Sequence, residues 1–219
     1  MSSATGPDPA DPPRRRAPQQ QRAAETEKRI LDAAESLFAQ KGFEAVTTKQ
    51  LAQASGVATG ALYHHFDGKD EIYRAVVQRA FEARSAVPEH LLDRSLDPEP
   101  RLVGLIEWFT STILADESFR LLFSRELLDP QEGSPHLLNR EVFQQGFGVL
   151  REVVEDTLPD VNLDEAAAIV LALAYGLSNL RGIYEIYPGA TPLGTPHEVA
   201  VYTTRILLHG LGGGQPEQL

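Results

Sequence analysis

Residues 47–66 read TTKQLAQASGVATGALYHHF, and this stretch decides the fold prediction. Thr47 and Gln50 stand three residues apart, which is the spacing of a capping box at a helix start. Gly56 supplies a tight turn after the first short helix. The apolar positions on the inner side of the two helices are Leu51, Ala52, Val57, Leu62 and Phe66. This pattern predicts a helix-turn-helix, a motif whose second helix lies in the major groove of DNA.

Polar side chains stand where such a motif meets phosphates. Thr47, Thr48 and Lys49 crowd a helix N-terminus, where free amides favour an anion, and Lys69 opens the next helix in the same way. We expect Tyr63 and His64 on the recognition helix to donate to phosphate oxygens. The residues predicted to contact DNA are Thr47, Thr48, Lys49, Ala58, Thr59, Gly60, Ala61, Tyr63, His64 and Lys69.

Helical periodicity extends over nearly the whole chain and predicts an all-α fold of about nine helices. A first apolar stripe is formed by Ile30, Ala34, Leu37 and Phe38, and a fourth helix repeats it with Ile72, Val76, Val77 and Ala80. We expect Gly42 to end the first helix. Three dipeptides place a capping side chain before a proline and predict further helix starts: Asp97-Pro98, Ser134-Pro135 and Thr195-Pro196.

The run from Arg29 to Val77 resembles the DNA-binding domain of the TetR (AcrR-like) family of regulators. The features that carry the resemblance are LDAAESLFAQKGF, Thr47-Thr48, LAQASGV, Gly60, LYHHF and Lys69. The resemblance implies a C-terminal helical domain that forms a homodimer and often holds a small-molecule pocket. The family often has a hydroxyl or charged side chain at the position of Ala58 and a Ser or Thr at that of Ala61. This chain departs from the family at both positions. Base readout would then depend on Thr59, Lys49 and apolar contact with thymine methyl groups.

Charge and composition divide the chain. Residues 1–84 hold 12 basic and 11 acidic residues, whereas residues 85–219 hold 8 basic and 20 acidic ones, so the net charge of -11 belongs to the second part. We predict four segments: a disordered arm at 1–21, a helix-turn-helix domain at 22–68, a dimerisation and effector domain at 69–212, and a flexible tail at 213–219. Arg14, Arg15 and Arg16 are either a solvated charge run or an arm that binds phosphates or the minor groove.

The acidic part is rich in aromatic residues at helical spacings. Most of them should be core, but a subset can line an effector cavity. Tyr175 and Asn179 interrupt an otherwise apolar helix, so they need polar partners. The candidate effector-binding residues are Trp108, Phe109, Phe123, Phe147, Tyr175 and Asn179. The helices near 162–187 and 196–211 expose excess apolar surface and predict a four-helix interface in a homodimer.

The sequence has no cysteine, and its six histidines lack metal-ligand spacing, so we expect no metal and no cofactor. The longest apolar run is too short to span a bilayer, and we expect a cytoplasmic protein without a membrane partner. The favoured interpretation is a repressor that binds a pseudo-palindromic operator and is released by an unknown small molecule. One alternative is a regulator controlled by a partner protein. Another is an all-helical enzyme, although no catalytic constellation stands out.

Overall fold

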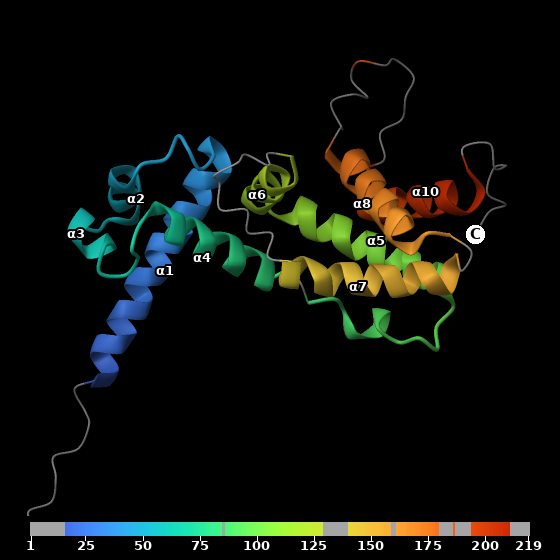
Figure 1. Ribbon diagram of the computed structural model, residues 1–219, viewed down its shortest axis with the longest axis horizontal. Coiled ribbons are helices and arrows are strands. Elements are labelled where there is room, and N and C mark those ends of the chain that lie inside the picture. The colour runs from blue at the N-terminus through green and yellow to red at the C-terminus, as the bar shows by residue number, and fades with distance from the viewer. Residues whose placement is uncertain are drawn as a thin grey trace, which may run out of the picture.

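The computed structural model describes residues 16–84, 86–128, 140–158, 161–179, 186 and 194–210. This part of the chain is all-helical, as predicted, and contains nine α-helices and one 3-10 helix (Figure 1). Their bounds are α1 Arg16–Lys41, α2 Thr48–Ser55, α3 Thr59–Leu62, α4 Lys69–Glu82, η1 Glu89–Leu91, α5 Pro98–Ala115, α6 Glu117–Leu128, α7 Arg140–Thr157, α8 Leu163–Asn179 and α10 Pro196–His209.

The first helix begins earlier than the sequence led us to expect. It starts at Arg16, so residues 16–21 are helical, which differs from the predicted disordered arm at 1–21. The reason is local, because glutamine, alanine and arginine are good helix formers and Pro18 is tolerated in the first turn. Residues 1–15, with Arg14 and Arg15, lie outside the described residues. The N-terminal half of α1 projects from the body of the molecule (Figure 1).

The end of α1 and the start of α4 lie where the sequence predicted them. Gly42 adopts φ 79°, a left-handed conformation that glycine tolerates at a helix end, directly after the last residue of α1. The helix that we predicted to open at Lys69 does begin there. The expected apolar stripes of α1 and α4 face each other, and Ile30, Phe38 and Val76 are fully buried.

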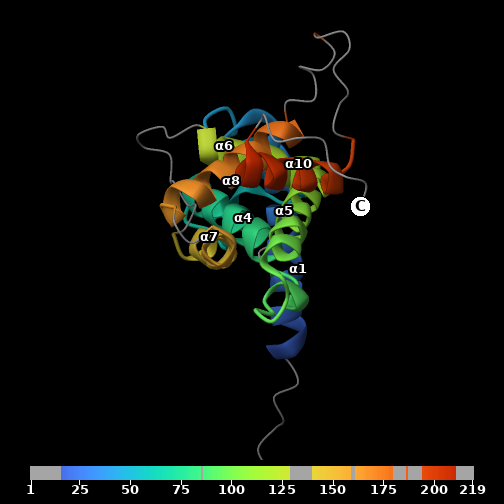
Figure 2. The same cartoon turned by 90° about the vertical axis from the view of Figure 1, so that its right-hand side faces the viewer.

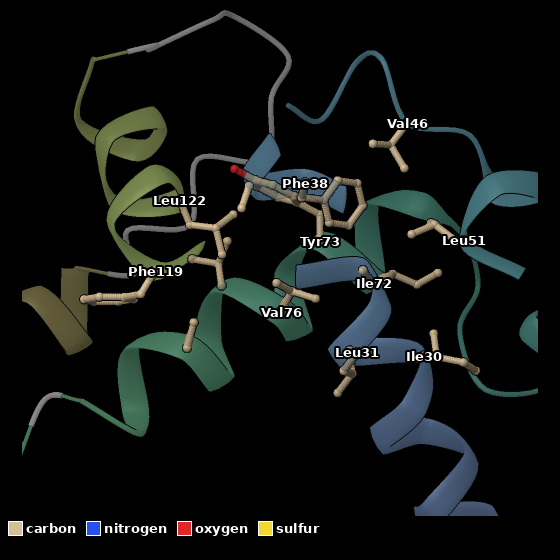
Figure 3. Close-up of a cluster of buried hydrophobic side chains, with 14 of the residues drawn as sticks. Ile30, Leu31, Phe38, Val46, Leu51, Ile72, Tyr73, Val76, Phe119 and Leu122 are labelled. Carbon is tan, nitrogen blue, oxygen red and sulfur yellow. The ribbon is translucent and has the colours of Figure 1, made fainter. Parts of the chain in front are cut away.

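The N-terminal core unites α1 to α4 with one face of α6. The ring of Phe38 meets that of Tyr73 edge to face at 5.0 Å. Figure 3 shows Leu122 of α6 in the same cluster of buried side chains. Because α4 contributes six buried residues to this unit, the predicted domain boundary between residues 68 and 69 lies inside a continuous core.

Side-chain hydrogen bonds join α6 to the N-terminal unit as well. The guanidinium of Arg125 donates to the carbonyl oxygens of Ala39 and Gln40, both at 3.2 Å, and so satisfies carbonyls in the last turn of α1. The hydroxyl of Tyr73 in α4 donates to the carboxylate of Glu126, which is buried. These bonds hold one end of α6 against α1 and α4.

The C-terminal core is built by α5, α7, α8 and α10. The helices α8 and α10 lie side by side, and both pack on α5 (Figure 2). As predicted, Thr195 caps the start of α10, and the structure adds a capping box with Glu198. The N–H of Glu198 donates to the hydroxyl of Thr195 at 3.2 Å, and the Thr195 N–H donates to the Glu198 carboxylate at 2.8 Å. Pro98 opens α5 as predicted, although Asp97 makes no side-chain cap bond.

Two further predicted features, the helix start at Ser134-Pro135 and the tail at 213–219, lie outside the described residues. Among the described helices, none is both long enough and apolar enough to cross a membrane.

Candidate functional site

The capping box predicted at the start of α2 is present. The N–H of Gln50 donates to the hydroxyl of Thr47 at 3.2 Å, and the N–H of Thr47 donates to the side-chain oxygen of Gln50 at 2.9 Å. The hydroxyl of Thr48 accepts from that of Tyr63 at 3.4 Å, which links the start of α2 to the residue after α3. Lys49 is exposed beside them. A helix N-terminus with two hydroxyls and an ammonium group is suited to bind a phosphate.

The turn between α2 and α3 follows the prediction. Gly56 adopts φ 68° as the C-cap of α2, and the N–H of Val57 donates to the Ala52 carbonyl at 3.0 Å. On the inner side of α3, Leu62 is fully buried. The outer side presents Thr59 and Gly60, both exposed. The two helices are thereby fixed as a helix-turn-helix pair whose second helix has a polar and small outer surface.

The recognition helix is shorter than we expected. It ends at Leu62, so Tyr63 and His64 lie in the turn that follows rather than on the helix. The N–H of His64 donates to the Ala61 carbonyl at 3.2 Å, a three-residue bond that tightens the chain after α3. Both side chains are still exposed, next to the outer surface of α3.

Of the residues expected to read bases, Thr59 therefore lies on a helix of only four residues, whereas Lys49 lies on α2. Ala58 precedes α3 as its N-cap without a side-chain bond, and Ala61 is half-buried. A Cβ added to Gly60 would meet nothing within 4 Å, so open space lies in front of that position. Close approach of another molecule's surface to α3 is sterically free.

Lys69 has a structural partner that the sequence did not reveal. Its ammonium donates to the Phe43 carbonyl at 3.0 Å and lies 4.0 Å from the centre of the Phe43 ring. This contact ties the start of α4 to the loop after α1. Lys69 is therefore engaged in a contact within the protein, whereas the other predicted DNA-binding residues lie on or next to α2 and α3.

A cavity of about 90 Å³ lies where α4 ends against α5, α6, α7 and α8. Four of the predicted effector residues line it: Trp108, Phe109, Phe123 and Phe147. The lining also includes Phe81, Arg84 and Phe119, which we did not predict for this role. Phe81 continues the apolar period of α4, so its burial could have been read from the sequence. Nothing in the sequence distinguishes Arg84 from other arginines.

Tyr175 and Asn179 do not line the cavity. The hydroxyl of Tyr175 donates to that of Ser124, which joins α8 to α6. The amide of Asn179 donates to the Tyr175 carbonyl at 2.8 Å and accepts from Arg120 at 3.4 Å. The protein itself therefore supplies the polar partners for which a ligand was considered.

The N-terminal unit and the cavity are connected by ion pairs. Arg79 of α4 pairs with Asp32 at 2.8 Å and with Glu35 at 2.9 Å, both in α1. Arg84, in the cavity lining, pairs with Asp116 and lies 3.9 Å from Glu35. Among the described residues, no group of three or more His, Asp or Glu side chains is placed to hold a metal ion.

Comparisons with known proteins agree with this geometry. Residues 30–76 match the model of the bacterial regulatory proteins of the tetR family. The HTH-type transcriptional repressor KstR2 of Rhodococcus jostii (strain RHA1) is 30% identical over 131 residues, which are 58% of this chain and 64% of that protein. The chain thus spans less than two thirds of the length of this relative.

Solved structures show the same fold. The TetR family regulator PfmR from Thermus thermophilus has a TM-score of 0.62 and 24% identity, with 83% of this chain and 98% of that chain covered. The fatty acid degradation regulator FadR from Bacillus halodurans has a TM-score of 0.65 and 17% identity, with 86% and 97% covered. At these identities the likeness concerns the fold alone.

Proposed function

We propose that this chain is a member of the TetR family of bacterial regulatory proteins, whose model residues 30–76 match, and that it is a sequence-specific DNA-binding repressor that works through α2 and α3. The observation that carries this proposal is the exposed outer surface of α3, at Thr59 and Gly60, beside the hydroxyls and ammonium group at the start of α2. Major-groove entry requires a fixed helix with free space in front of it. Phosphate contacts from Thr47, Thr48 and Lys49 would set its position.

Two copies of the chain would bind one operator. Regulators of this family are dimeric and bind DNA operators. In this chain the apolar side chains of Ile169 on α8 and Val201 on α10 are 51% and 40% exposed, on helices that pack side by side. Ala168 and Ala172 are exposed on α8 as well. We infer that α8 and α10 pair with their copies in a two-fold interface, for which a pseudo-palindromic operator is the matching target.

A small molecule would control the repressor through the cavity. Its walls come from the end of α4 and from the C-terminal helices, so a ligand there touches both parts of the chain. A ligand that binds better when the DNA-binding domains are set apart would release the protein from DNA. A thermal-shift screen that finds no ligand would favour the alternative, control by a partner protein. A cytoplasmic location stays a prediction.

The test is fluorescence-anisotropy binding to DNA from the upstream region of the protein's own gene. We expect tight binding that resists scrambled competitor and weakens with salt, at two protomers or more per site. Lys49→Gln should weaken binding to all sequences and reduce the slope of log affinity against log salt by about 1. Binding no tighter than to scrambled DNA, across a genomic fragment library too, would contradict the proposal.

A further inference from the structure

The cavity combines an apolar lining with one charged side chain. Of the described residues that line it, only Arg84 is charged and only Thr112 carries a hydroxyl. The rest are aliphatic or aromatic side chains, among them Phe119, whose ring centre lies 4.6 Å from the guanidinium carbon of Arg84. The Arg84 side chain is 23% exposed, so its guanidinium group is partly removed from water and is stabilised by anionic or polar partners.

The guanidinium of Arg84 has donors to spare. Among the described residues it donates two hydrogen bonds, one to the carbonyl of Ala80 at 2.9 Å and one to the carboxylate of Asp116. A guanidinium group carries five N–H donors in a planar fork that matches a carboxylate with two parallel bonds. Glu35 lies 3.9 Å away, too far for a hydrogen bond. The side chain is therefore able to bind a second anion or exchange its present one.

Asp116 does not depend on Arg84 alone. Its other carboxylate oxygen accepts from the N–H of Phe119 at 3.1 Å, in the first turn of α6. Burial raises the pKa of Asp116, but the backbone N–H of Phe119, followed by Arg84, more than compensates and holds that pKa below its usual value. The N-terminus of α6 also favours a negative charge. Asp116 would thus keep the hydrogen bond from the N–H of Phe119 if Arg84 turned to another partner.

We propose that the cavity binds a small apolar molecule ending in one carboxylate, which takes the guanidinium of Arg84 in place of Asp116. This deepens the proposed function and rests on it, since it names the chemical class of the effector. The apolar part occupies the space between Phe109, Phe123 and Phe147. A cavity of about 90 Å³ is smaller than the apolar cavity of about 150 Å³ that holds benzene, so it suits a short aliphatic chain.

The binding step acts directly on the end of α4. Arg84 stands two residues beyond α4, and Phe81, in its last turn, forms another part of the wall. Exchange of Asp116 for a ligand would undo the ion pair that fixes this end to the α5–α6 junction. A ligand larger than the present cavity would also press on Phe81. Both effects would change how α4 and the helix-turn-helix are held.

The test is calorimetric titration of the full-length protein, without DNA, with butanoate and hexanoate and with the matched alcohols 1-butanol and 1-hexanol. We expect the carboxylates to bind at least about tenfold more tightly than the alcohols, as charge-assisted hydrogen bonds imply. Arg84→Gln should remove that difference, and Arg84→Lys should retain part of it. Arg151→Gln, which deletes an exposed ion pair with Asp164 outside the cavity, is the matched control and should leave it intact.

Equal affinity for acids and alcohols on the natural protein, or no binding of either, would overturn the proposal without use of any variant. An Arg84→Gln protein that melts normally and still prefers acids would overturn it too. Since these titrations contain no DNA, their failure is distinct from a failure of operator binding, which the anisotropy measurement detects separately.

Discussion

At the scale of single residues, Arg101 is the most unusual side chain of the C-terminal core. It is a charged side chain that is only 1% exposed. Its guanidinium donates to the carboxylate of Asp156 at 2.9 Å and to the carbonyl of Leu91 at 3.3 Å. Arg94 donates to the other carboxylate oxygen at 2.8 Å. Asp156 of α7 therefore neutralises the charge of the buried Arg101 in α5. Through Arg94 it also holds the segment that follows η1.

We expect Asp156→Asn to destabilise the protein by about 2 kcal/mol, because it leaves a buried guanidinium group without its anion while Asp156 itself is partly exposed. Urea unfolding followed by circular dichroism measures this loss. Glu155→Gln, at the neighbouring exposed position, is the control and should unfold at the same urea concentration as the natural protein. A stability equal to the control would show that water satisfies Arg101 instead.

The same carboxyl predicts how stability depends on pH. The hydrogen bond from Arg94 holds the pKa of Asp156 below its usual value; burial opposes this, and Arg101 lowers it further. The folded state then binds its proton at lower pH than the unfolded chain does. The stabilisation is complete above the unfolded value of about 3.9 and is lost as the pH falls through the lowered folded value. The urea midpoint should fall between pH 5 and pH 2 less steeply in Asp156→Asn than in the natural protein.

At the scale of elements, two glycines of the helix-turn-helix have opposite roles. Gly56 has φ 68°, so an added side chain would be strained there. Gly60 lies in α3 with open space in front of it, and its φ is not positive. The first glycine serves the turn between the helices, whereas the second keeps the outer surface of α3 free.

Gly56→Ala should therefore destabilise the protein by about 1 kcal/mol, the cost of a left-handed non-glycine residue. Gly60→Ala should keep or raise stability, by about 0.5 kcal/mol, because alanine is the better helix former. Thermal melting measures both. In the anisotropy assay, however, Gly60→Ala should weaken DNA binding, since its methyl group stands where α3 approaches the groove. Unchanged DNA affinity of Gly60→Ala would argue against α3 as the recognition helix.

At the scale of the whole molecule, α6 and the end of α4 join the two parts of the chain. One end of α6 bonds to α1 and α4 through Arg125 and Glu126, while Phe119 and Phe123 line the cavity. The rings of Phe81 and Phe119 meet edge to face at 5.3 Å, which continues the contact into α4. The cavity is thus bounded by the elements that hold the helix-turn-helix.

The proposed dimer makes a prediction at this scale. Ile169→Asp places a charge in the inferred α8 and α10 interface, where its desolvation is unfavourable. We expect at least about a tenfold weaker self-association in sedimentation velocity and weaker operator binding, with an unchanged helical spectrum. Leu96→Asp alters a similarly exposed leucine between η1 and α5 and should stay dimeric. If both variants associate like the natural protein, the interface lies elsewhere.

The sequence by itself determined the all-helical fold, the helix-turn-helix and the surface that we assign to DNA. Each of these follows from signals within a few residues. Thr47 and Gln50 form the capping box that opens α2, Gly42 and Gly56 adopt positive φ at helix ends, and Thr195 caps α10. Such signals act through local backbone bonds and side-chain periods, so they are legible without the rest of the chain. The end of α3 was misjudged because a short terminal turn has no distinct side-chain pattern.

Only the tertiary structure decided which side chains line the cavity and which charges are buried. Arg84 meets Asp116 across 32 residues, Arg101 meets Asp156 across 55, and Tyr73 meets Glu126 across 53. No local pattern distinguishes these arginines from exposed ones. An aromatic residue at helical spacing shows the same sequence pattern whether it lies in a core or in a cavity wall. Their roles depend on how helices distant in sequence pack, which is settled by the fit of whole apolar faces rather than by neighbouring residues.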